Sequence, residues 1–160
     1  GLQTVDGSLQ IRGRLTGFTA ATDIGGTLAA VDYAGLTRLE SVGADLGMGG
    51  DMSQVNLPAL ADVGGDLVVQ QSLLHEIVLP SLVHVGGEIL VDGNTFLERW
   101  EGMSDGGKID GNFTASFNQP ITNAEFQDWI DGGSVAVGGR IKICRNGNQL
   151  DPGEDTCNEM

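Results

Sequence analysis

Three acidic residues recur at one position of a repeating pattern and are the clearest candidates for acid–base chemistry. Asp45, Asp66 and Glu88 each stand directly before an alternating apolar segment. If these segments are stacked parallel strands, the three carboxylates form a column with a spacing of about 4.8 Å. Retaining glycoside hydrolases use two carboxyl groups about 5 Å apart. The column therefore indicates glycan cleavage as one option, beside a solvated ladder or a contact with a cation or sugar.

The C-terminal tail contains a second group of side chains that carry oxygen atoms. Five of them fall within ten residues, namely Asn146, Asn148, Asp151, Glu154 and Asp155. Oxygen ligands on a flexible loop suit Ca²⁺, so these residues are candidate calcium ligands. Their order does not match an EF-hand loop, and the Asn-Gly and Asp-Pro-Gly steps are also ordinary turn sequences. A turn-rich tail without metal is the alternative, and no other cofactor is expected.

The two cysteines of the chain, Cys144 and Cys157, lie in this same acidic tail. Their placement suits a disulfide and an oxidising compartment. Such a bond would close a loop of about a dozen residues and contribute roughly 3 kcal/mol in the chain-entropy model. Two free thiols are the alternative.

The other reactive residue types form no catalytic group. His75 and His84 are the two histidines, and Ser81 lies near His84 without the sequence context of a nucleophile. The cysteines lack the spacing of a zinc site, and the Gly-Gly pairs lack the spacing of a phosphate-binding loop. We therefore expect no catalytic residue, and the acidic column is the alternative.

A repeat of about 20 residues must position these side chains. The unit Asp66–Gly87 matches the unit Asp45–Gly65 almost position by position. Each opens with alternating apolar residues, continues through an apolar run that ends in proline, and closes with Val-Gly-Gly. Further units are expected to open at Thr27, Glu88 and Lys108, the last of them directly after a Gly-Gly corner at 106–107.

Alternation within each unit is typical of a β-strand, and equivalent strands of neighbouring units can stack in parallel. We therefore expect a mainly β fold, a right-handed parallel β-helix of about seven coils over residues 1–143. In this fold Leu46, Leu67 and Ile89 should lie above one another. Residues 144–160 form the acidic, cysteine-containing tail.

The repeat is interrupted at residues 118–133. Thr122 and Glu125 have the spacing of a capping box, and the apolar residues that follow have the spacing of one helix face. A short helix near residues 124–131 is expected, with Trp129 packed on the end of the solenoid as part of a cap. A platform for an aromatic ligand is the alternative role of Trp129.

The charge of the chain limits its partners. Asp and Glu number 22 against 8 Lys and Arg, which gives a formal net charge of −14. Such a surface repels nucleic acid and anionic lipid. It either attracts cations or basic partners or serves only to keep the protein in solution. Because of this charge, nucleic-acid binding is not expected. No run of 18 apolar residues is present, so membrane insertion is not expected either.

Two stretches resemble known families. The pattern L-x-x-V-G-G-D-L-x-V…L-x-x-I-x-L-P-x-L-x-x-V-G-G in Leu60–Gly87 resembles the receptor L-domain, and leucine-rich repeats share much of it. That family includes ligand-binding lobes of insulin and epidermal-growth-factor receptors and bacterial surface proteins. The tail CRNGNQLDPGEDTC resembles short Cys-rich repeats of exported proteins from myxobacteria and their relatives. The resemblances imply an exported bacterial module, located outside the cell, on its surface or in the periplasm.

These observations favour a non-enzymatic recognition module that binds a protein or glycan partner. The runner-up is a carbohydrate-active enzyme that uses Asp45, Asp66 or Glu88. A structural spacer or adhesin stalk segment is the third hypothesis.

Overall fold

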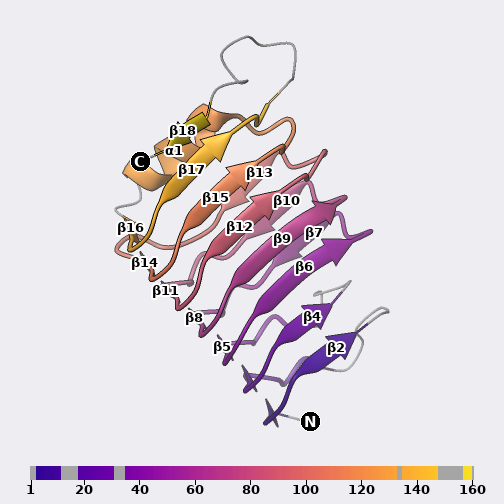
Figure 1. Cartoon of the computed structure of the whole chain (residues 1–160). Helices are drawn as coiled ribbons and strands as arrows, with labels where there is room; N and C mark the ends of the chain where they lie inside the picture. The colour runs from indigo at the N-terminus through magenta and orange to yellow at the C-terminus, as the bar shows by residue number, and fades with distance from the viewer. Residues whose placement is uncertain (1–2, 12–17, 31–34, 133–134, 148–156, 160) are drawn as a thin grey trace.

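The computed structural model describes residues 3–11, 18–30, 35–132, 135–147 and 157–159. In this part the chain winds into a parallel β-solenoid with one short helix near its C-terminal end (Figure 1). The expected mainly β, parallel solenoid fold is therefore confirmed.

Two long sheets and one short sheet form the walls of the solenoid. The first long sheet consists of seven parallel strands, β1 (Thr4–Val5), β3 (Asp23–Ile24), β5 (Ser41–Val42), β8 (Asp62–Val63), β11 (His84–Val85), β14 (Lys108–Ile109) and β16 (Ala136–Val137). The short sheet consists of β7 (Gln54–Asn56), β10 (Glu76–Val78) and β13 (Arg99–Glu101).

The second long sheet has eight strands and carries the candidate site described below. Seven are parallel, β2 (Leu9–Ile11), β4 (Leu28–Ala30), β6 (Leu46–Gly50), β9 (Leu67–Ser72), β12 (Ile89–Asp92), β15 (Phe113–Ser116) and β17 (Ile141–Cys144). The eighth, β18 (Cys157–Glu159), pairs antiparallel with β17 at the edge of the sheet.

Apolar residues at equivalent positions form ladders through the interior. Leu46 pairs with Leu67, which pairs with Ile89, and all three are fully buried. The predicted stacking of these residues is confirmed. Because one coil cannot bury its own apolar face, each rung depends on the rungs beside it.

The Gly-Gly corners bring neighbouring coils very close together. A methyl group on Gly87 would lie 2.9 Å from the carbonyl carbon of Gly65 and would collide with the carboxylate of Asp66. This corner therefore has no room for a side chain at Gly87, which explains its Val-Gly-Gly pattern, whereas Ala44 holds the equivalent position of an earlier coil.

A buried ladder of polar side chains runs along the carboxyl ends of strands β9, β12, β15 and β17. The Nδ2 of Asn94 donates to Oδ1 of Asn118 at 2.8 Å, and Asn118 donates in the same way to Asn146 at 2.8 Å. Ser72 hydroxyl donates to Asn94 at 2.6 Å at one end, and Asn146 donates to Asn123 at 2.9 Å at the other. The ladder provides hydrogen-bond partners for polar groups that are buried where the chain leaves these strands.

The helix α1 (Asn123–Gly132) agrees with the helix expected near 124–131. The capping box is present, since Thr122 N–H donates to Glu125 Oε2 at 2.8 Å and Glu125 N–H donates to Thr122 Oγ1 at 3.2 Å. Phe126 is fully buried with its ring 6.0 Å from that of Phe113. Trp129 packs edge-on against Trp100 at 5.5 Å, so its ring is part of the cap.

The sixth unit does not open where the sequence pattern placed it. Lys108 is the first residue of β14 and pairs with His84 in the seven-stranded sheet. The opening position is Asn112, and the corner consists of Asp110 and Gly111. The Gly-Gly pair at 106–107 instead belongs to a turn that needs a left-handed residue, since Gly106 has a φ of 79°.

Candidate functional site

The outer surface of the eight-stranded sheet presents a nearly uncharged column on an acidic protein. One residue per strand faces outward between two inward-facing residues, and we call this column the outer strip. Its members are Gln10, Ala29, Gly47, Val68, Leu90, Thr114 and Lys142, each the Cα partner of the next. Lys142 is its only charged member, although the whole chain carries a net charge of −14. Depletion of charge is a feature of the centre of interaction surfaces.

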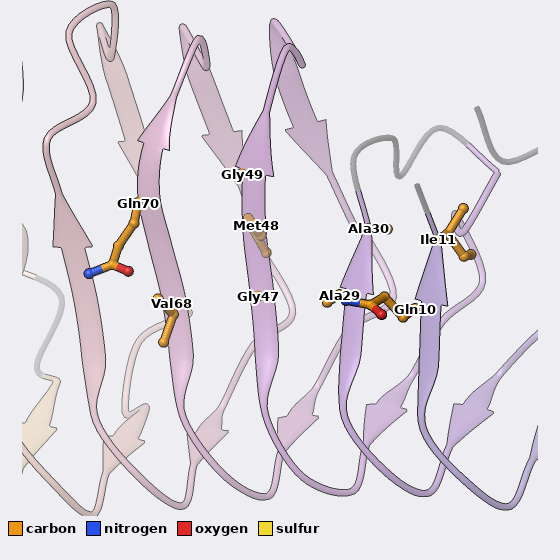
Figure 2. Close-up of a pocket in the computed structure, with 9 residues that line it drawn as sticks. All are labelled: Gln10, Ile11, Ala29, Ala30, Gly47, Met48, Gly49, Val68 and Gln70. Atoms are coloured by element: carbon orange, nitrogen blue, oxygen red, sulfur yellow. The ribbon is translucent and has the colours of Figure 1, made fainter. Parts of the chain in front are cut away.

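A shallow hollow of about 410 Å³ lies on the outer strip at strands β2 to β9. Ala29, Gly47 and Gly49 form its floor, while Gln10 and Val68 stand on either side (Figure 2). The hollow exists because β6 has glycine at positions 47 and 49, while the neighbouring strand β9 carries the side chains of Val68 and Gln70. Two amide groups, of Gln10 and of Gln70, provide hydrogen-bonding groups at its margin.

Gly47 is a glycine that the fold itself does not require. A methyl group there would find its nearest atom, the Cβ of Ala29, at 3.8 Å, which is ordinary van der Waals contact. Glycine within a strand weakens it and often marks a place where another molecule approaches the backbone. Gly47 therefore contrasts with the corner glycines, which the packing of the coils demands.

The acidic column exists, but two of its members bind the backbone. Asp45 Oδ1 accepts the N–H of Asp66 at 3.0 Å, and Asp66 Oδ1 accepts the N–H of Glu88 at 2.9 Å. Ser8 and Asn112 make the same contact at 3.1 and 2.9 Å in other coils. In four coils this position therefore supplies an oxygen acceptor for the next coil, and the acceptor is a carboxylate in two of them.

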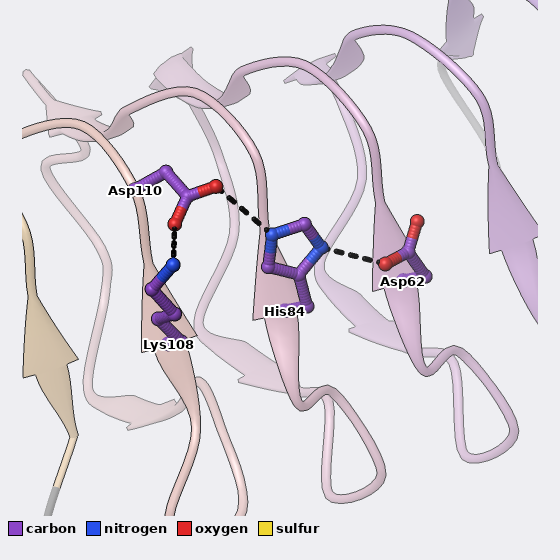
Figure 3. A network of polar contacts seen from close by, with 4 residues as sticks. All are labelled: Asp62, His84, Lys108 and Asp110. Carbon is purple, nitrogen blue, oxygen red and sulfur yellow. Dashed lines mark hydrogen bonds and ion pairs between the residues drawn. The ribbon is translucent and has the colours of Figure 1, made fainter.

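A charged network crosses three strands of the seven-stranded sheet (Figure 3). The Nδ1 of His84 lies 2.7 Å from Asp62 Oδ2, and its Nε2 lies 3.2 Å from Asp110 Oδ2. Lys108 forms an ion pair with the other oxygen of Asp110. Hydrogen bonds with Asp62 and Asp110 raise the pKa of His84, while Lys108 and His84 lower the pKa of Asp110.

The sequence pattern missed both the outer strip and this network. Ser81, which lies near His84 in the sequence, donates its hydroxyl to the Pro58 carbonyl at 2.6 Å. Alignment of the repeats was the signal that could have found the network. His84 is the Cα partner of Asp62 and of Lys108.

The two cysteines occupy directly opposed positions on β17 and β18, as Cα partners. Cys144 is buried, Cys157 is exposed, and both are free thiols in this structure. Burial, together with a hydrogen bond to Cys157, raises the pKa of Cys144 to about 11. Their opposed placement brings the two residues close together, and the disulfide remains a prediction.

Of the five candidate calcium ligands, only Asn146 lies within the described residues. Its side chain is fully buried, and both its amide oxygen and its amide nitrogen are used in the asparagine ladder. It is therefore committed to the fold rather than to a cation. Asn148, Asp151, Glu154 and Asp155 lie outside the described residues, so calcium binding by the tail remains a prediction. Among the described residues no group of three His, Cys, Asp or Glu side chains is placed to hold a metal ion.

These features define the class of the protein as a parallel β-solenoid with a capped C-terminal end. None of its described helices is long and apolar enough to cross a membrane. No family model, curated protein or solved structure matches the chain. The likenesses to the receptor L-domain and to the myxobacterial tail repeat therefore remain resemblances of sequence pattern.

Proposed function

We propose that this protein is a non-enzymatic recognition module that binds a protein or glycan partner on the outer strip. The observation that carries the proposal is the hollow around Gly47, where the fold leaves space that it does not need. A partner that enters the hollow can contact strand backbone directly and can hydrogen-bond with Gln10 and Gln70. The rigid stacked strands hold this surface in one shape, which lowers the entropic cost of binding.

An extracellular, cell-surface or periplasmic location goes with this proposal. It is supported by the resemblance of Leu60–Gly87 to the receptor L-domain and of the tail to repeats of exported bacterial proteins. The two opposed cysteines are also consistent with an oxidising compartment.

The runner-up, a carbohydrate-active enzyme that uses Asp45, Asp66 or Glu88, has less support. Asp45 and Asp66 each accept a backbone N–H from the next coil, which is a structural task. If the enzyme hypothesis holds, glycans incubated with the protein are cleaved and Asp66→Asn abolishes cleavage. A binding module leaves the glycans intact.

The test of the proposed function is binding of the whole chain to arrays of glycans and of immobilised surface proteins. Gly47→Leu fills the hollow without adding charge, and the free space at this position predicts that the variant folds. Ala136→Leu is the matched control, because Ala136 is an exposed strand residue of the seven-stranded sheet. We expect Gly47→Leu to weaken every specific signal at least tenfold and Ala136→Leu to leave the signals unchanged. Signals that survive Gly47→Leu contradict the assignment of the hollow.

A further inference from the structure

At the C-terminal end of the same sheet lies a second, smaller pocket of about 220 Å³. It spans β15 and β17, which are neighbours in Figure 1. Its lining residues are Asn112, Thr114, Arg140, Ile141 and Lys142. We propose that this pocket binds an anionic group, a carboxylate or a sulfate, on the partner of the recognition module.

The pocket is lined by positively charged side chains, although the protein as a whole is negatively charged. The chain has 22 acidic and 8 basic residues, yet the lining contains two of the basic residues and no acidic one. Arg140 directly precedes β17 and Lys142 is the second residue of that strand, and both side chains line the pocket on the same face of the sheet. Two cations on one face attract an anion at short range even though the whole molecule repels it at long range.

The polar groups of the pocket are donors. Arginine and lysine can only donate, and the Thr114 hydroxyl, on the Cα partner of Lys142, can donate as well. Asn112 uses its side-chain oxygen to accept the N–H of Arg140 at 2.9 Å. Since that oxygen is occupied, the group that Asn112 offers to a ligand is its Nδ2 donor. Four donors around one pocket match the lone pairs of an oxyanion.

Arg140 is the principal cation of this site. It forms no ion pair with any residue in the described part of the chain, whereas Arg99 is held between Glu76 and Glu101 and Lys108 pairs with Asp110. Lys142 lies beside β18, which sets Glu159 opposite it in the strand pairing.

This inference rests on the proposed function in one respect, that partners approach the outer face of this sheet. It adds the chemistry of the group through which the partner binds, which is an oxyanion. A carboxylate and a sulfate share the same recognition chemistry, so the ligands of the test separate the two.

The test is a ¹H–¹⁵N NMR titration of the whole chain with sodium sulfate, sodium acetate, glucuronate and glucose. Sodium chloride at equal ionic strength is the reference. We expect saturable shifts of the amides at 112–114 and 140–142 with at least one oxyanion. Glucuronate should bind and glucose should not, if the ligand is a uronic acid. Saturation by sulfate alone assigns a sulfated ligand.

Variants decide whether the pocket is responsible. Arg140→Gln and Lys142→Gln should each weaken anion binding at least tenfold, since each removes a charged donor. Arg99→Gln is the matched control, because it removes one positive charge from a different sheet, and it should leave the binding unchanged. Absence of saturable shifts, or equal affinity of Arg140→Gln and the natural chain, overturns the inference.

The two proposals can fail separately. If Gly47→Leu abolishes partner binding while no anion occupies the pocket, the recognition surface stands and the anion site is wrong. If anions bind the pocket but Gly47→Leu leaves partner binding unchanged, the assignment of the hollow as the binding site is wrong and the anion site stands.

Discussion

Asn118 illustrates how much a single buried residue does in this solenoid. Its Oδ1 accepts from the N–H and the Nδ2 of Asn94 at 3.2 and 2.8 Å, and its Nδ2 donates to the Val91 carbonyl at 2.9 Å. Asn118→Ala would leave these partners unpaired where no water reaches, at about 1–3 kcal/mol for each group. We expect the variant to lose about 3 kcal/mol or more of unfolding free energy in urea denaturation.

The control for this prediction is an asparagine on the surface. Asn56 lies exposed at the end of β7, so Asn56→Ala should change the unfolding free energy by less than about 0.5 kcal/mol. Equal effects of the two substitutions would mean that the buried ladder contributes nothing specific.

The His84 network makes stability depend on pH at two limits. The pKa of His84 is raised from 6.5, so the stability gained from its imidazolium is complete below 6.5 and is lost as pH rises through the folded-state pKa. The pKa of Asp110 is lowered from 3.8, so its contribution is present above 3.8 and is lost as pH falls further. The network therefore stabilises the fold most between these limits.

His84→Gln tests the upper limit. The difference in unfolding free energy between the natural chain and the variant should shrink as pH rises from about 6 to about 9. Denaturant unfolding at several pH values measures it, and His75→Gln, at an exposed histidine outside the network, is the control. A difference that is constant over this range contradicts the role of the imidazolium.

At the scale of the structural element, the corner between successive coils depends on glycine. Gly87→Ala would force its methyl group against the Gly65 carbonyl carbon and the Asp66 carboxylate, so the coils would have to move apart. Overpacking of this kind costs about 1–3 kcal/mol. Gly7→Ala is the control, because nothing lies within 4 Å of the added methyl group there. Thermal unfolding should show a clearly lower Tm for Gly87→Ala alone.

The elements that the sequence predicted best are those with a repeated steric cause. The strands that follow Thr27, Asp45, Asp66 and Glu88 lie in the expected register because each inward residue must be apolar and each corner must be narrow. The prediction of the next opening at Lys108 was wrong because Asp110 replaces the first corner glycine, while the Gly-Gly pair at 106–107 belongs to an ordinary turn.

The candidate sites were harder to predict because they depend on side chains of neighbouring coils, either on one that is missing or on several that meet. The hollow on the outer strip is visible only when Gly47 is set beside Ala29 in the paired strands. His84 meets Asp62 and Asp110 only because residues 22 and 26 positions apart become neighbours. The acidic column was visible in the sequence, but its backbone hydrogen bonds were not.

At the scale of the whole molecule, the two ends of the solenoid differ. At the C-terminal end α1 places Phe126 against Phe113, and β18 continues the eight-stranded sheet beyond β17. At the N-terminal end β2 is the last described strand of that sheet, and its inward residues Leu9 and Ile11 remain half-exposed. Since burial against neighbouring coils stabilises each strand, the half-exposed strand β2 should open more readily than the fully buried central strands.

Hydrogen exchange of backbone amides tests this asymmetry. We expect amides of β2 and β4 to exchange at least tenfold faster than those of β9 and β12, whose inward residues are fully buried. Phe126→Ala removes the anchor of the cap, so it should accelerate exchange in β15 and β17 much more than in β4. Because opening of a coil exposes the next one, the change should decay with distance from the cap rather than stop at one strand. Uniform protection along the solenoid, or acceleration of β4 equal to that of β17, would show that the molecule opens as one unit and that the cap has no local role.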